Sequence, residues 1–344
     1  MTMKKIYLAV FTMALLLAAC GDKKSENVRL SGTLQGMADD TIYLYGTDRY
    51  YNRLDTIFVK QGKFVKDIEV DTLVSAWLQF GNGMEYPLYM DKADQIEISG
   101  SAGKPGLLAV KGNPANEELT RFHQELFGKG LPSEAAVEKA AEAFIRSHPN
   151  SLASIYVLDK YFVQKSVPNF SKIKELSEQM AGSLKDRLYM EQLLEYLESY
   201  EKVSVGKSAS YFQIPGMDGK DIRRTDFKDK YLLLYFWASW SDECRETTRQ
   251  LKQLYKEKKN REKFDILGVS LDVDKEVWKD AVANDTLDWK QGCDLKGWNA
   301  SLVGQFAVRT LPYNVLLAPS GRIEGRNLTQ KEIEEKLAEI AKKK

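Results

Sequence analysis

The chain has 344 residues, of which 43% are hydrophobic and 29% are charged, and its formal net charge is +1 at pH 7. This balanced charge argues against a nucleic-acid partner, which would favour a basic surface. The length favours about two domains, and three cysteines are too few for a disulfide-stapled scaffold.

The N-terminus has the pattern of an export signal. Two lysines precede an apolar run at positions 6–17 that is too short to span a bilayer comfortably, and small residues then lead to Cys20. This ending resembles a bacterial lipobox, which implies removal of residues 1–19 and a lipid on Cys20; an ordinary signal peptide is the alternative. We therefore expect a cell-envelope protein, anchored by lipid to a membrane and facing an oxidising compartment, with residues 20–27 as a tether.

Residues 28–112 are expected to form an antiparallel β-sandwich-like domain. Short runs rich in β-branched and aromatic residues alternate with turn residues, and they lie at 28–32, 41–45, 55–59, 63–65, 75–80 and 95–98. Segments 31–37 and 55–64 resemble the N-terminal β-domain of many lipoproteins of Bacteroidota. Packing explains the aromatic residues better than a ligand-binding face does; they are Tyr43, Tyr45, Tyr50, Tyr51, Trp77 and Tyr86.

Residues 113–204 change to a helical period. Apolar side chains recur every three or four positions, which predicts four or five helices within 118–122, 135–146, 152–161, 170–181 and 186–200. His123 and His148 lie here with no second histidine or cysteine nearby. A surface or capping role is therefore favoured over metal binding for both.

Residues 205–344 alternate apolar strands with helices. A hairpin-like opening at 208–227 precedes strands expected at 231–237, 264–271, 310–317 and near 323, and helices expected at 242–258, 275–284, 300–306 and from 328 onward, with Thr329 as a cap. Strand, helix and strand in that order imply a right-handed crossover and a parallel pair. Any site should then lie at the carboxyl ends of the strands.

The stretch from Phe236 to Glu246 resembles the active-site turn of thioredoxin-like disulfide reductases, and the resemblance covers about residues 205–340. It implies an α/β thioredoxin-like domain that exchanges thiols and disulfides with proteins or peptides of the cell envelope. Where that family has Cys-x-x-Cys, this chain has Ser241 and Cys244, and a hydroxyl cannot enter a disulfide. The ordinary two-cysteine cycle within the motif is therefore excluded, so the activity must be altered or lost.

The same resemblance assigns the remaining site residues. Cys244 is the expected catalytic residue, and the substrate-binding residues are Trp240, Arg245, Leu311 and Pro312, the last as a cis-proline at a strand start facing the cysteine. A direct reading gives Ser241 a simpler role, because its hydroxyl can cap the following helix. Glu243 suits the positive end of that helix and disfavours a thiolate at Cys244.

Three mechanisms stay open. Cys244 and Cys293 could form a redox pair, which requires their Cα atoms to lie within about 7 Å. Cys244 alone could be a thiol peroxidase, because Ser-x-x-Cys resembles the peroxiredoxin motif, although Trp237 stands where that family has proline. The surface between Trp240 and Pro312 could also hold an extended peptide without any sulfur chemistry. The sequence shows no cofactor signature and no metal-ligand cluster.

Overall fold

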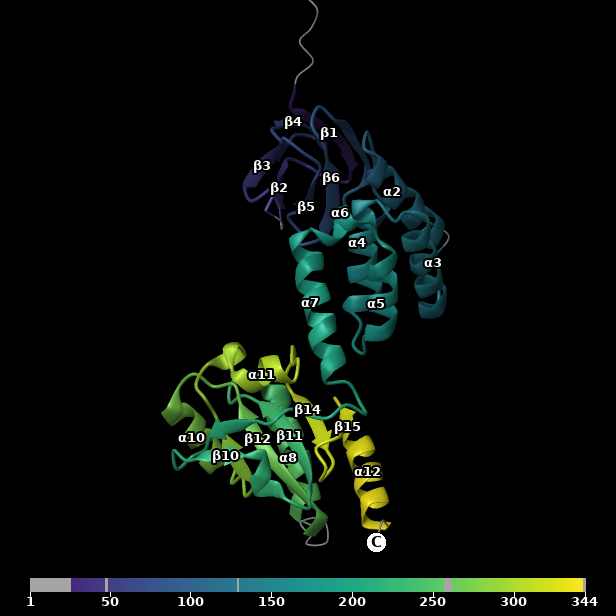
Figure 1. Cartoon of the computed structure of the whole chain (residues 1–344). Helices are drawn as coiled ribbons and strands as arrows, with labels where there is room; N and C mark the ends of the chain where they lie inside the picture. Colours follow the sequence, from purple (N-terminus) through teal and green to yellow (C-terminus); the bar gives the residue numbers. More distant parts are fainter. Residues whose placement is uncertain (1–25, 47–48, 129, 257–261, 343–344) are drawn as a thin grey trace, which may run out of the picture. The chain divides into compact units, whose positions relative to one another are not determined.

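The computed structural model describes residues 26–46, 49–128, 130–256 and 262–342, and the chain divides into two compact units between Gln192 and Leu193 (Figure 1). The expected signal sequence, the lipid site at Cys20 and most of the tether lie outside the described residues. Within the described ranges, no helix is long and apolar enough to cross a membrane.

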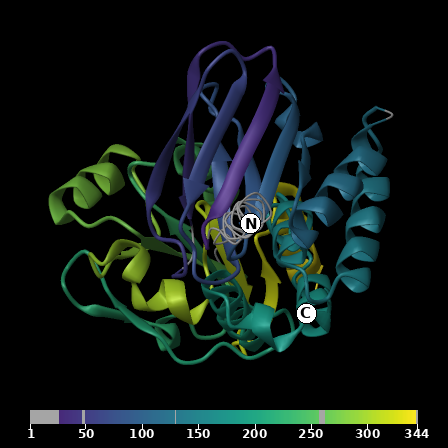
Figure 2. The ribbon, with the colours of Figure 1, turned by 90° about the horizontal axis from the view of Figure 1, so that it is seen from above.

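The first unit contains two four-stranded sheets, with the orders β4-β1-β7-β8 and β3-β2-β5-β6. Its strands are β1 (Val28–Gln35), β2 (Asp40–Gly46), β3 (Leu54–Val59), β4 (Lys63–Ile68), β5 (Val74–Gln79), β6 (Glu85–Met90), β7 (Gln95–Ser101) and β8 (Ala109–Lys111). Figure 2 shows them, in purple and blue, as a layered group. The predicted strand-rich N-terminal domain is confirmed. Among the strand pairs of its described residues, only β1 with β7 is parallel.

Alternation along the strands builds the core of these sheets. On β2, Ile42 and Leu44 are fully buried while Tyr43 between them is exposed, as the period of two requires. The sequence did not predict β6, which contains Pro87. Because β6 lies at the edge of its sheet, a residue without an N–H is tolerated there.

Apart from the short η1 between β7 and β8, the helices of the first unit follow its strands, which confirms the predicted helical middle segment. They are η1 (Pro105–Leu107), α2 (Pro114–Phe127), α3 (Glu134–Ser147), α4 (Leu152–Leu158), the π-helix η2 (Asp159–Val163), α5 (Phe170–Gln179), α6 (Gly182–Lys185) and the start of α7 (Leu188–Lys202). Figure 1 shows α3, α4 and α5 side by side. Asparagine or serine side chains cap the first turns of α2 to α5.

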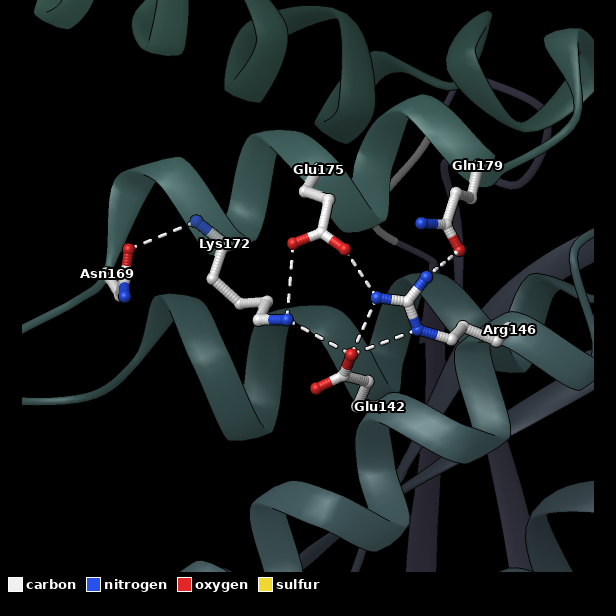
Figure 3. Close-up of polar contacts among 6 residues, drawn as sticks. All are labelled: Glu142, Arg146, Asn169, Lys172, Glu175 and Gln179. Atoms are coloured by element: carbon white, nitrogen blue, oxygen red, sulfur yellow. Dashed lines mark hydrogen bonds and ion pairs between the residues drawn. The ribbon is translucent and has the colours of Figure 1, made fainter.

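An ion-pair network links α3 to α5 (Figure 3). Glu142 pairs with Arg146 at 2.6 Å on its own helix and with Lys172 at 3.0 Å on α5, and Lys172 also pairs with Glu175 at 3.2 Å. These groups are partly exposed, so each pair adds little stability. Fully buried apolar side chains such as Ile145 hold the helices together.

His123 is buried on α2, so the expected surface or capping role is wrong. The imidazole packs against the rings of Tyr86, Phe122 and Tyr156, and its Nδ1 has no hydrogen-bond partner among the described residues. Loss of water on burial lowers the pKa of His123 to about 4. The reason is positional, because His123 lies one helical turn after the buried Leu119 and shares its face.

His148 has the capping role that the sequence predicts. It is the C-cap residue of α3, and its backbone N–H donates a hydrogen bond to the carbonyl oxygen of Phe144 at 3.0 Å.

The second unit contains a five-stranded mixed sheet in the order β13-β12-β11-β14-β15, with a small β9–β10 hairpin. The strands are β9 (Gln213–Pro215), β10 (Asp221–Arg223), β11 (Tyr231–Trp237), β12 (Phe264–Ser270), β13 (Lys290–Gly292), β14 (Tyr313–Leu317) and β15 (Ile323–Arg326). The helices are η3 (Arg224–Phe227), α8 (Asp242–Lys256), α10 (Lys275–Asn284), η4 (Gly297–Asn299), α11 (Ser301–Gln305) and α12 (Gln330–Lys342). As predicted, β11 and β12 are parallel.

Strand β11 is buried on both faces, which explains its unbroken apolar run. Leu232, Leu234 and Phe236 belong to one hydrophobic cluster, whereas the alternate residues Leu233 and Tyr235 belong to the cluster on the other face. The carboxyl end of this central strand leads directly into the turn before α8. The fold therefore places that turn at the sheet edge where the sequence predicts a site.

Candidate functional site

Ser241 is the residue immediately before α8, and it acts as a helix cap. Its Oγ accepts a hydrogen bond from the backbone N–H of Cys244 at 3.3 Å and donates one to Glu243 at 3.2 Å. The side chain is almost completely buried. The hydroxyl of Ser241 is thus engaged in holding the start of the helix.

Cys244 lies in the first turn of α8 and is fully buried. The hydroxyl of Tyr235 donates a hydrogen bond to the carbonyl oxygen of Cys244 at 2.8 Å and shares another with Thr248 at 3.1 Å. Burial raises the pKa of the Cys244 thiol above its ordinary value, and the hydrogen bond from Ser241 offsets only part of that effect. At neutral pH the sulfur is therefore a protonated thiol closed off from solvent.

Cys293 follows β13 directly and is also buried. Its Sγ donates a hydrogen bond to the carbonyl oxygen of Asp272 at 3.3 Å, and burial raises the pKa of this thiol as well. Cys244 and Cys293 belong to the same hydrophobic cluster, which Trp237 and Trp289 also join. Both cysteines are free, so the structure brings them into one cluster without a bond between them.

Asp272 is a buried carboxylate that the sequence did not single out. It follows β12, is 2% exposed, and accepts hydrogen bonds from the backbone and hydroxyl of Ser239 and from the hydroxyl of Ser270. The side chain therefore fixes the turn before α8, while its carbonyl oxygen holds Cys293. A signal was available, because an acidic residue directly after a buried parallel strand lies at the edge where sites form.

The Leu311–Pro312 peptide bond is cis, as the sequence predicts. Pro312 lines a cavity of about 210 Å³ together with Thr247 and Leu251 of α8, which lie about one and two turns beyond Cys244. Leu311 is partly buried and packs against both hydrophobic clusters of the unit. The strand start therefore lies beside the helix that carries the cysteine.

Four exposed apolar side chains surround the carboxyl ends of the parallel strands. Trp240 follows β11 and is 59% exposed, Val273 follows β12 and is 71% exposed, and Leu295 and Trp298 follow β13. These four residues are called the apolar rim below. Arg245, which the sequence analysis expects to bind substrate, forms an ion pair with Asp242 in the first turn of α8.

No group of three or more His, Cys, Asp or Glu side chains in the described ranges is arranged to hold a metal ion. The features that the structure places at this end of the sheet are a capped helix start, two buried thiols and the apolar rim.

Comparison with known proteins identifies the family. Residues 229–323 match the model of a thioredoxin-like family, and residues 28–119 match that of a domain family of unknown function. The C-terminal domain is thioredoxin-like. The thioredoxin-like match covers the sheet from β11 to the start of β15, including the turn before α8.

Relatives of the thioredoxin-like part include oxidoreductases. The thiol-disulfide oxidoreductase ResA of Bacillus cereus is 26% identical over 148 residues, which is 43% of this chain and 83% of that protein. A solved thiol-disulfide oxidoreductase from Bacteroides fragilis is 43% identical, and the match covers 39% of this chain and 99% of that one with a TM-score of 0.38. A thioredoxin-like protein from Bacteroides caccae is 21% identical, with 60% and 77% covered and a TM-score of 0.49. The thioredoxin-like part is thus related in sequence to thiol-disulfide oxidoreductases.

Proposed function

We propose that the thioredoxin-like domain does not exchange disulfides through residues 241–244 and that it instead holds an extended polypeptide of the cell envelope. The observation that carries this proposal is the complete burial of Cys244 behind a hydroxyl that serves as a helix cap.

Exchange requires a thiolate that can reach a disulfide sulfur of the substrate. Thiol-disulfide exchange is the activity named for the relatives from Bacillus cereus and Bacteroides fragilis, and we do not extend it to this chain. Here Ser241 has no sulfur to offer, and burial both keeps the Cys244 thiol protonated and separates it from solvent. A solitary thiol peroxidase would need the same exposed thiolate, so the geometry does not support that alternative either.

Polypeptide binding needs no sulfur. The apolar rim leaves the indole of Trp240 and the side chain of Val273 in solvent at the end of the sheet, where a partner could bury them. Next to α8, the backbone of Leu311 at the cis peptide could hydrogen-bond to an extended segment, whereas β14 itself is already paired with β11 and β15. We therefore take the partner to be an envelope protein or peptide, held by apolar side chains and backbone hydrogen bonds.

Restoring the missing sulfur tests the proposal. We expect the wild-type chain and Cys244→Ser to show equally little reduction of insulin disulfides. Ser241→Cys should gain at least about tenfold, because the new thiol sits at a helix N-terminus that favours a thiolate and because position 241, unlike Cys244, keeps some exposure to solvent. That thiolate would attack the substrate disulfide, and Cys244 would displace the substrate thiol, so that two electrons pass to the substrate while a disulfide forms in the turn.

One alternative has a specific observation behind it, since Cys244 and Cys293 share a hydrophobic cluster. If wild-type protein reduces insulin and both Cys244→Ser and Cys293→Ser lose that activity, the two residues form a redox couple and the binding proposal is wrong. If only Ser241→Cys is active, the proposal stands.

We further propose that the protein is exported and anchored by a lipid on Cys20, on the strength of the lipobox-like sequence before it. Cells grown with labelled palmitate should yield a labelled wild-type protein in the membrane fraction. The Cys20→Ser variant should lose the label and leave the membrane fraction. A labelled Cys20→Ser variant would refute lipidation at this residue.

A further inference from the structure

A cavity of about 180 Å³ in the first unit has walls that are largely aromatic. It lies between β5, β6, α4, η2 and the start of α7, and its aromatic lining residues are Trp77, Tyr89, Tyr156 and Tyr189. The rings of Trp77 and Tyr156 meet at a steep angle of 63° with their centroids 5.8 Å apart. A cavity of about 150 Å³ accommodates one benzene ring, so this one has room for a single small group.

Two features of the lining are unusual for a purely structural void. The hydroxyl of Tyr89 is buried and has no hydrogen-bond partner in the described part of the chain, which is costly unless a ligand supplies one. Residues 159–163 form a π-helix, a rare element that is frequent at functional sites. That π-helix begins with Asp159, which lines the cavity.

Asp159 brings a negative charge to this aromatic wall. Its carboxylate accepts hydrogen bonds from the hydroxyl of Tyr189 and from the side-chain amide of Gln164, and no cationic side chain of the described residues pairs with it. Both donors are neutral, so neither balances the charge of the carboxylate. A carboxylate oxygen can accept more than one hydrogen bond, which leaves room for a ligand donor.

Arg187 also lines the cavity, but it forms no ion pair with Asp159. The guanidinium lies over the ring of Tyr50, 4.7 Å from the centroid, and donates a hydrogen bond to the carbonyl oxygen of Leu73 at 3.0 Å. The carboxylate of Asp159 therefore has no direct cationic partner among the side chains that the structure describes, and a cationic ligand could supply one.

We propose that this cavity binds an organic ammonium ion that also carries a hydroxyl or N–H group. The ring faces of Trp77 and its tyrosine neighbours attract a cation through their quadrupoles, and a desolvated site strengthens that attraction. Asp159 supplies the opposite charge, and Tyr89 supplies the buried hydrogen-bond partner. The inference does not depend on the function of the thioredoxin-like domain.

Three probes of matched shape separate charge from size: choline, the neutral 3,3-dimethyl-1-butanol and the anionic 3,3-dimethylbutanoate. In calorimetric titrations of the full chain we expect choline to bind about tenfold more tightly than the alcohol. The anion should show no binding. Nα-acetyl-lysine amide, whose side-chain amine stays free, tests a primary ammonium ion. It therefore distinguishes a lysine side chain from a quaternary ammonium ligand.

Two variants test the named residues. Asp159→Asn should weaken choline binding about tenfold, whereas the control Asp67→Asn, an exposed carboxylate on β4 outside the cavity, should leave it unchanged. Tyr89→Phe should weaken choline but not tetramethylammonium, which has no hydroxyl. It should also leave the free energy of unfolding unchanged or raised, because it removes an unpartnered polar atom.

Several results would overturn the proposal. They are equal binding of the alcohol and choline, preference for the anion, absence of saturable heat with every cation, and a folded Asp159→Asn variant with unchanged affinity for choline.

Discussion

His123 makes the stability of the first unit depend on pH. Its folded-state pKa of about 4 lies below the ordinary 6.5, so the unfolded chain binds more protons between these values. The stabilising effect of keeping the imidazole neutral is complete above pH 6.5 and is lost as the pH falls toward 4. We expect the free energy of unfolding to drop by about 2 kcal/mol between pH 7 and pH 5 from this residue.

Urea titrations at several pH values check this prediction. A His123→Phe variant, which keeps an aromatic ring in the cluster, should flatten the dependence between pH 6.5 and pH 5. His148→Gln removes the other histidine and serves as the matched control. An equally steep dependence in His123→Phe would show that another group is responsible.

At the level of single residues, the sequence predicts local roles better than contacts between distant segments. The cap formed by Ser241 depends on neighbours in the chain, and it was predicted. The cis peptide before Pro312 was expected from the family resemblance, and the structure has it.

The burial of His123 follows from its helical spacing to Leu119 and could have been predicted. The contact of Cys293 with the carbonyl of Asp272, and the aromatic rings that surround His123, depend on segments that only the folded chain brings together. Those features could not be derived from one sequence.

Between helices α3 and α5, apolar packing should outweigh the visible ion pairs. We expect Glu142→Gln, which breaks the centre of the network in Figure 3, to leave the urea midpoint nearly unchanged because its pairs are partly exposed. Ile145→Ala on the same helix should cost about 3 kcal/mol, because it empties a fully buried position. Equal shifts for the two variants would show that the charges hold these helices.

The same contrast explains which elements were predicted. Strand β11 carries a continuous apolar run because both of its faces are covered, and that run is visible in the sequence. Strand β13 has three residues and exists because it pairs with β12, so it leaves no local pattern. Strand β6 contains Pro87, which obscured a strand that its edge position permits.

For the molecule as a whole, we propose that the thioredoxin-like domain needs the end of α7, before the expected boundary at residue 205. Arg326 is almost fully buried, donates a hydrogen bond to the carbonyl oxygen of Val203 at 2.6 Å, and lies over the ring of Tyr200 at 4.3 Å. A fragment of residues 193–344 should therefore be about 2 kcal/mol more stable than one of residues 205–344, because the shorter one leaves a buried charge without these partners. Urea unfolding of both fragments measures the difference, and coincident midpoints would contradict it.

The burial of the Cys244 and Cys293 sulfurs should also make the purified protein resistant to oxidation. Air and trace metals attack thiolates that they can reach, and neither Cys244 nor Cys293 presents one while the chain stays folded. Purified protein that lacks Cys20 should therefore keep for long periods without reducing agents and remain free of covalent dimers.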